Sequence, residues 1–264
     1  EKCSSLKLIA ISPSISTEFV GINSSIIIIK NANESNSLYR FAAKLKKESS
    51  IPENINEAVK YFKMAIEKGN FYAMNDYALT LEHNVVPVNE EEAVKYFKMS
   101  IEKGCVTAMY NYGCMLTRDQ GVYINIEEGI KYLKMAIDNG NASAMSKYAC
   151  MLDNGKGIPV NKSEAIKYYK MAIEKGKPLA MNNYALILDR GDGVPVNKSE
   201  AIKYYKMAIE KGDTSAMYNY AYMLEKGNGI PVDINEAMKY YKMAADKGDA
   251  DSIQRLEILN QQYC

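Results

Sequence analysis

The sequence predicts an all-α protein, a right-handed α/α solenoid of about six helix hairpins followed by a closing helix. Three observations predict it: one motif recurs at a nearly constant spacing, each copy holds two segments with helical periodicity, and signals for helix ends flank these segments. The motif begins Ala-Met-x-x-Tyr-Ala-x-x-Leu, and its first alanine recurs as Ala73, Ala108, Ala144, Ala180 and Ala216. Such regular spacing indicates structurally equivalent units stacked along the chain.

Each copy of the motif contains two amphipathic helices. In the first, Tyr148 and Ala149 lie on one side at 100° per residue, and in the second Ala165, Tyr169 and Ala172 do the same. Lysines and glutamates occupy the other side of the second helix. We therefore expect helix hairpins whose core is built from alanine, which lets backbones approach closely, and tyrosine, which fills the remaining space.

The predicted ends of the second helices follow a fixed pattern. Each begins with Asn or Asp followed three residues later by Glu, a variant of the capping box. The predicted capping residues are Asn54, Asn89, Asn125, Asn161, Asn197 and Asp233. Each second helix then ends at a glycine suited to a left-handed cap, namely Gly69, Gly104, Gly140, Gly176, Gly212 or Gly248. A last helix from about Asp249 is expected to close the stack.

Residues 1–36 differ from the repeats that occupy residues 37–264. This N-terminal segment is rich in Ser and Ile and contains two short runs typical of β-strands, Leu6 to Ile11 and Ile26 to Ile29. The composition of the whole chain is nearly neutral, with 33 Lys and Arg against 32 Asp and Glu. We therefore expect no binding of nucleic acid, and expect instead a protein or peptide partner recognised by local shape. The longest apolar run, Ile26 to Ile29, is far shorter than the roughly 20 residues that span a bilayer, so we expect no membrane insertion within this chain.

The residues that most often carry chemistry are few. The five cysteines are odd in number, which favours a reducing, cytoplasmic compartment over a disulfide-stapled module, and Cys114 and Cys150 at equivalent repeat positions are expected to be free thiols. His83 is the single histidine, and triplets such as Gly155-Lys-Gly157 fit turns between helices better than phosphate loops. We therefore expect no catalytic residues, no metal site and no cofactor, and predict that the chain is not an enzyme.

The candidate partner-binding surface lies on the first helices, opposite their predicted buried side, at offsets of 2, 6 and 9 from the repeat alanine. An apolar middle file flanked by acids and amides suits a peptide with apolar anchors and some basic residues. The alternative is that this row packs against neighbouring first helices. The row consists of Asn75, Leu79, Glu82, Tyr110, Cys114, Thr117, Ser146, Cys150, Asp153, Asn182, Leu186, Asp189, Tyr218, Tyr222 and Glu225.

The order Ala-x-x-x-Leu-Gly, Gly-x-Gly, Ala-x-x-Tyr-Tyr-x-Lys-Ala-Ala, Gly resembles the Sel-one-like repeat, a tetratricopeptide-like unit. The resemblance covers about residues 37–260, with Tyr148 and Ala149 standing in place of the Leu-Gly pair. It departs from the family at residues 82–88, which lack both glycines, and at Tyr123, which replaces the usual proline. First helices usually line the concave surface of such solenoids, so we expect a scaffold or adaptor that holds a partner protein on its concave face. The resemblance implies the same role, because Sel-one-like proteins are mainly adaptors in multiprotein complexes.

Two alternatives remain open. The stretch Cys3-Ser-Ser-Leu-Lys-Leu-Ile-Ala-Ile, then Pro13-Ser-Ile15, resembles the end of a leucine-rich repeat of the BspA-like surface-protein type. That resemblance implies a cell-surface or adhesive protein. The other alternative is an enzyme resembling the Cys-rich members of the Sel-one-like family, which implies disulfides between paired helices.

Overall fold

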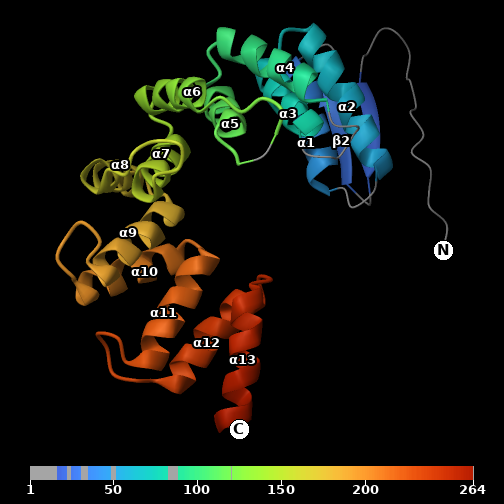
Figure 1. The fold of residues 1–264 in the computed structure, drawn as a ribbon. Helices are drawn as coiled ribbons and strands as arrows, with labels where there is room; N and C mark the ends of the chain where they lie inside the picture. Colours follow the sequence, from blue (N-terminus) through green and yellow to red (C-terminus); the bar gives the residue numbers. More distant parts are fainter. Residues whose placement is uncertain are drawn as a thin grey trace. The chain divides into compact units, whose positions relative to one another are not determined.

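A computed structural model describes residues 17–22, 25–30, 35–48, 52–82, 89–119 and 121–263. The chain divides into two compact units, Glu1–Ala136 and Ile137–Cys264, which are described separately (Figure 1). In the first unit β1 (Thr17–Ile22) pairs antiparallel with β2 (Ser25–Lys30), Thr17 lying opposite Lys30. Strand β2 contains the run Ile26 to Ile29, whereas Leu6 to Ile11 lies outside the described residues.

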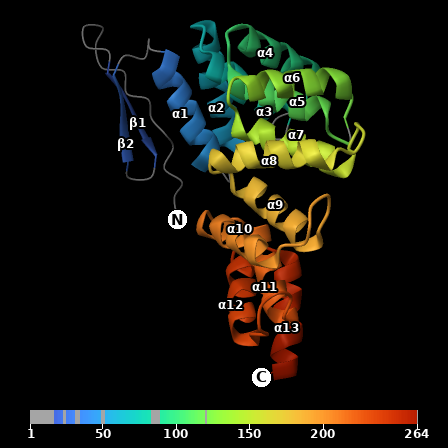
Figure 2. The same cartoon turned by 90° about the vertical axis from the view of Figure 1, so that its left-hand side faces the viewer.

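Helix hairpins make up the rest of the described structure. The helices of the first unit are α1 (Ser35–Glu48), α2 (Pro52–Glu67), α3 (Phe71–Glu82), α4 (Glu90–Glu102), α5 (Val106–Leu116) and α6 (Ile126–Asp138), whose last residues cross the division. Those of the second unit are α7 (Ala142–Asn154), α8 (Lys162–Glu174), α9 (Pro178–Arg190), α10 (Lys198–Glu210), α11 (Thr214–Lys226), α12 (Ile234–Ala245) and α13 (Ala250–Tyr263). Successive odd- and even-numbered helices pair as hairpins, as α9 with α10 and α11 with α12 show in Figure 2. The predicted all-α solenoid of helix hairpins with a closing helix is confirmed.

The predicted capping boxes hold in five of the six second helices. At α8, the Glu164 amide donates to Asn161 Oδ1 at 3.0 Å and Asn161 Nδ2 donates to Glu164 Oε2 at 3.3 Å. The exception is α2, which begins at Pro52, so Asn54 lies inside the first turn and its prediction as a cap is wrong. Proline lacks an amide hydrogen and suits the first turn of a helix, which lets α2 start earlier than the motif predicts.

The core consists of alanine and tyrosine, as the periodicity predicts. Ala149 and Ala172 are fully buried, and Tyr184 of α9 meets Tyr204 of α10 edge to face at a ring-centroid distance of 5.1 Å. The exposed Lys206 of α10 lies over the Tyr220 ring of α11, with its Nζ 5.2 Å from the centroid. Lys206 therefore links one hairpin to the next through a cation–π contact in addition to facing solvent.

The hairpin of α5 and α6 is closed by two glycines in helix interiors. A Cβ added at Gly129 would lie 2.5 Å from Thr117 Cγ2 and 3.0 Å from Leu116 Cβ, and one added at Gly113 would lie 3.0 Å from the Gly129 carbonyl oxygen. Any side chain here would push the helices apart. Other repeats have alanine at both positions, so the two glycines allow the helices of this hairpin to approach more closely than alanine would.

Helix α13 has the buried residues of a first helix on one face and exposed polar residues on the other. Ser252 and Leu259 are buried and lie on the side that packs against the preceding hairpin. The positions that correspond to the buried Ala221 and Leu224 of α11 are Glu257 and Asn260, both exposed. Helix α13 therefore presents an exposed polar face where earlier first helices receive a second helix, as expected of a capping repeat.

Candidate functional site

The first file of the predicted row, at offset 2, is not a free surface. Asn75, Ser146 and Asn182 are buried, whereas Tyr110 and Tyr218 are half-buried. The reason is contact between neighbouring first helices: Asn111 Nδ2 donates to Asn75 Oδ1, and Asn219 Nδ2 donates to Asn182 Oδ1, each at 2.9 Å. The expectation that this file is exposed is therefore wrong at the three buried residues.

The file at offset 9 is occupied by interactions within the chain. Thr117 and Glu225 are buried, which contradicts their expected exposure, while Glu82, Asp153 and Asp189 are half-buried. Each of the four carboxylates pairs with a cation of the chain itself. We call these four arrangements the carboxylate clasps, because in each of them a carboxylate on a first helix is bound by a cation from another element.

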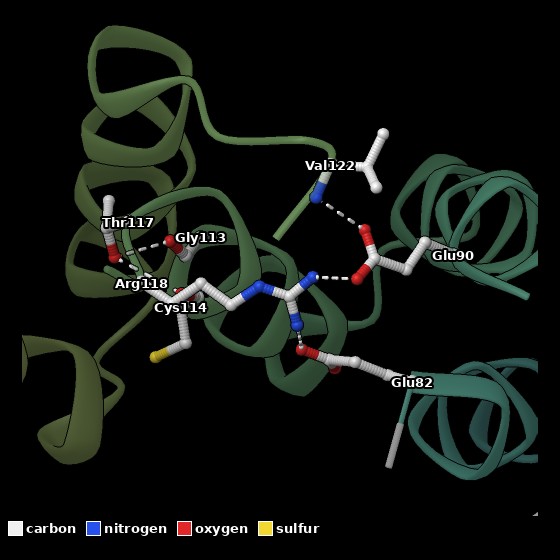
Figure 3. Close-up of polar contacts among 7 residues, drawn as sticks. All are labelled: Glu82, Glu90, Gly113, Cys114, Thr117, Arg118 and Val122. Atoms are coloured by element: carbon white, nitrogen blue, oxygen red, sulfur yellow. Dashed lines mark hydrogen bonds and ion pairs between the residues drawn. The ribbon is translucent and has the colours of Figure 1, made fainter. Parts of the chain in front are cut away.

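Figure 3 shows the clasp of the first unit, which joins α3, α4 and the segment after α5. Arg118 pairs with Glu82 Oε1 at 2.8 Å and with Glu90 Oε1 at 2.5 Å, and the Val122 amide donates to Glu90 Oε2 at 3.0 Å. Beside it, Thr117 Oγ1 donates to the Gly113 carbonyl at 2.8 Å, which explains the burial of the Thr117 hydroxyl. Arg118 thereby ties three segments of the first unit together.

Two clasps of the second unit use lysines at equivalent positions. Lys162 Nζ lies 2.7 Å from Asp153 Oδ1 and 2.5 Å from Asp192 Oδ2, and Lys198 Nζ lies 2.6 Å from Asp189 Oδ1. Burial opposes the charge of Lys162, but its hydrogen bonds to the two carboxylates outweigh this and raise its pKa. The acids at offset 9 are therefore neutralised within the chain, and we drop the expectation that they attract basic residues of a partner.

The last clasp fastens α13 to α11. Arg255 donates to Glu225 Oε2 at 2.7 Å through Nε and pairs with Oε1 through its terminal nitrogen, and the Tyr241 hydroxyl donates to Oε2 at 3.0 Å. The hydrogen bonds from Arg255 lower the pKa of Glu225 to about 2, because they favour its charged form although burial opposes it. Glu225 is thus a structural residue of the chain's closing contact.

The middle file, at offset 6, remains the most accessible part of the row. Leu79, Cys114, Cys150 and Leu186 are half-buried, and Tyr222 is 44% exposed. In the second unit, Cys150 of α7 and Leu186 of α9 both line a pocket of about 200 Å³. Tyr169 of α8 also lines this pocket, and its hydroxyl accepts a hydrogen bond from Asn183 Nδ2 at 3.4 Å.

One residue that lines the pocket, Cys150, is small for its position in the repeat. Cys150 stands at the position of Leu186 and Tyr222, and Ser146 stands at the position of Asn182. Because the serine is too short to bridge to the next helix, no bond equivalent to that between Asn182 and Asn219 forms, and Ser146 Oγ has no partner among the described residues. Sequence reasoning missed this pocket, although Cys150, which lines it and stands one repeat away from the larger Leu186, signals it.

The model of the Sel1 repeat matches residues 47–70, 72–105, 106–141, 142–177, 178–213 and 214–249. The chain belongs to the Sel1 repeat family. These six matches follow the six predicted units, so the resemblance inferred from the sequence is confirmed. No curated protein sequence matches the chain.

Solved structures of other Sel1 repeat proteins have the same fold. The chain is similar to a Sel1 repeat protein from Oxalobacter formigenes, with 26% identity and a TM-score of 0.72, over 84% of this chain and 88% of that one. It is also similar in fold to an immunity protein from Pseudomonas aeruginosa, with 21% identity and a TM-score of 0.59, over 80% of this chain and 81% of that one. Yeast Tom70 shares the fold at 17% identity and a TM-score of 0.62, over 87% of this chain and 47% of that one.

Sel1 repeats generally mediate protein–protein interactions, and this scaffold is typically non-catalytic. None of the described helices is long and apolar enough to span a membrane. In the part of the chain that the structure describes, Cys105, Cys114 and Cys150 form no disulfide, whereas the Cys-rich alternative implies disulfides between paired helices. His83 and the stretch that resembles a BspA-like leucine-rich repeat lie outside the described residues.

Proposed function

We propose that this Sel1 repeat protein is a scaffold that holds a partner protein on the first-helix face of its second unit, the face expected to be concave. The observation that carries the proposal is the exposed ring of Tyr222, which follows Leu186 and Cys150 at equivalent positions of α11, α9 and α7. Aromatic side chains that remain exposed on a regular surface are typical anchors of protein interfaces.

The other positions of the row support a narrower surface than the sequence predicts. Asn182 and Ser146 are buried between helices, and Asp153, Asp189 and Glu225 are held in the carboxylate clasps. These residues fix the spacing of the first helices, so that the apolar middle file is presented on a rigid support. A preformed surface of this kind binds with a smaller loss of conformational entropy than a flexible one.

Replacing both Leu186 and Tyr222 by arginine tests the proposal. Two charges in the middle file would have to be desolvated on binding, and we expect partner capture from the source cell to fall by about tenfold or more. The measurement is affinity capture with quantitative mass spectrometry, using the parent chain and the variant as bait. The variant should keep the parent's helical circular dichroism spectrum, because neither residue is fully buried.

A matched control carries the same chemical change elsewhere in the second unit. Val160 and Val196, in the turns before α8 and α10, are 57% and 56% exposed, and replacing both by arginine should leave capture unchanged. The proposal fails if the double variant of the first helices retains every partner, or if the two double variants lose the same partners to the same extent.

A further inference from the structure

One of the charged side chains that line the pocket between α7 and α9 forms no ion pair with a described residue. Four charged side chains line it, and Lys162 joins two of them, Asp153 and Asp192. The fourth, Arg190, is the exposed last residue of α9. Its guanidinium makes no hydrogen bond or ion pair with any residue that the structure describes.

The repeat shows what the cation at this position ordinarily binds. The equivalent residue in α11 is Lys226, which pairs with Glu225 Oε1 at 2.7 Å, and the equivalent after α5 is Arg118, which pairs with Glu82 and Glu90. At both positions, therefore, a cation is bound by a carboxylate of the chain itself.

A charge reversal removes that carboxylate from Arg190. The position of Glu90 in the first unit is taken by Lys162 in the second, and Lys162 binds Asp153, which corresponds to Glu82. Arg190 therefore has neither of the two carboxylates that bind Arg118. The equivalent of Glu90 is a lysine, and the equivalent of Glu82 is already paired with that lysine. Arg190 is left as an open cation at the edge of the pocket.

The floor of the pocket is apolar beside this cation. Leu186 lies one helical turn before Arg190, Ile187 follows it, and the buried Tyr169 lies beneath on α8. Because Cys150 takes the place of a larger residue, there is room here for one side chain of a partner. The complementary ligand has an apolar side chain for the floor and a carboxylate for Arg190.

We propose that the pocket between α7 and α9 binds a segment of the partner protein in which an apolar residue is flanked by an acidic one. This inference rests on the proposed function and specifies the chemistry of its partner. It also reverses the charge of the partner predicted from the sequence, since the acids of the row are occupied and Arg190 is not.

Short synthetic peptides test the inference directly. Each has one central Leu or Phe, flanked on both sides by Glu, by Gln or by Lys in a Gly-Ser background, and carries a fluorescent label. We expect the full chain to bind the Glu peptides about tenfold more tightly than the Gln peptides and the Lys peptides least, as fluorescence anisotropy would show. The Glu peptides should also slow alkylation of Cys150 but not of Cys114, its repeat equivalent, measured by mass spectrometry.

Two variants of one position separate the charge of Arg190 from its structural role. Arg190→Lys should keep the preference for Glu peptides, and Arg190→Glu should reverse it toward Lys peptides. The inference is overturned if no peptide binds, if Glu and Gln peptides bind equally, or if Arg190→Glu leaves the order unchanged. Should any of these occur while the double arginine variant of Leu186 and Tyr222 still loses its captured partners, the scaffold function stands without this pocket chemistry.

Discussion

Removing α13 by ending the chain before Asp249 should make the chain aggregate and should lower its melting temperature. The deletion exposes the flank of the sixth hairpin, including Tyr241 and Ala244, which are fully buried in the complete structure. It also removes the buried Leu259 and the pairing of Arg255 with Glu225. The loss of buried apolar area and of this ion pair amounts to about 4 kcal/mol, which is large for one repeat interface. Light scattering and thermal circular dichroism measure both effects.

A shorter truncation provides the control for α13. Ending the chain after Gln261 keeps Arg255 and Leu259 and removes only the end of the helix, so its melting curve should match that of the parent. If the chain that lacks all of α13 does not aggregate and melts at the parent's temperature, the assignment of α13 as the capping helix is wrong.

Protonating Glu225 should release α13 from the second unit at acid pH. The folded chain holds the pKa of this carboxyl at about 2, below the ordinary value of 4.5, so the clasp stabilises the fold fully above pH 4.5. Its contribution, about 2 kcal/mol after allowance for the solvent around Arg255, is lost as the pH falls from 4.5 toward 2. Hydrogen exchange of residues 250–263 should accelerate over this window before the rest of the second unit unfolds.

Two isosteric variants make this prediction specific. Glu225→Gln should accelerate exchange in α13 already at neutral pH and abolish the additional change between pH 4.5 and 2. Asp189→Asn alters the equivalent position in α9, where Lys198 and not α13 provides the cation, and should leave exchange in α13 as in the parent. Equal exchange in α13 for the parent and Glu225→Gln at every pH would show that the clasp does not hold this helix.

The repeat pattern predicts the fold nearly completely because each hairpin is determined locally. Contacts within a single hairpin place the capping pair Asn161 and Glu164 and the core residues Tyr169 and Ala172, so the spacing of these residues in the sequence is enough to predict their roles. The one failed cap, Asn54, stands near a proline that offers an earlier start. There a local signal outside the motif overrides the motif itself.

The candidate site was less predictable from the sequence because it depends on contacts between neighbouring helix hairpins. A helical wheel marks Asn75 and Asn182 as opposite the core of their own hairpin, but it does not show that the next first helix covers them. The same limit applies to Glu225, whose partner Arg255 lies on another helix. The equivalence of Glu90 and Lys162 can be read from the sequence, but its effect on Arg190 follows only from which carboxylate each cation reaches.

The most direct test of the scaffold function is photo-crosslinking from position 222. A benzophenone amino acid in place of Tyr222 should crosslink the partner protein in the source cell. The same group in place of Tyr72, an aromatic residue of α3 with similar exposure at 46% against 44%, should not. Crosslinks to one partner from position 222 alone would place it on the first helices of the second unit, and crosslinks from position 72 but not from position 222 would contradict that assignment.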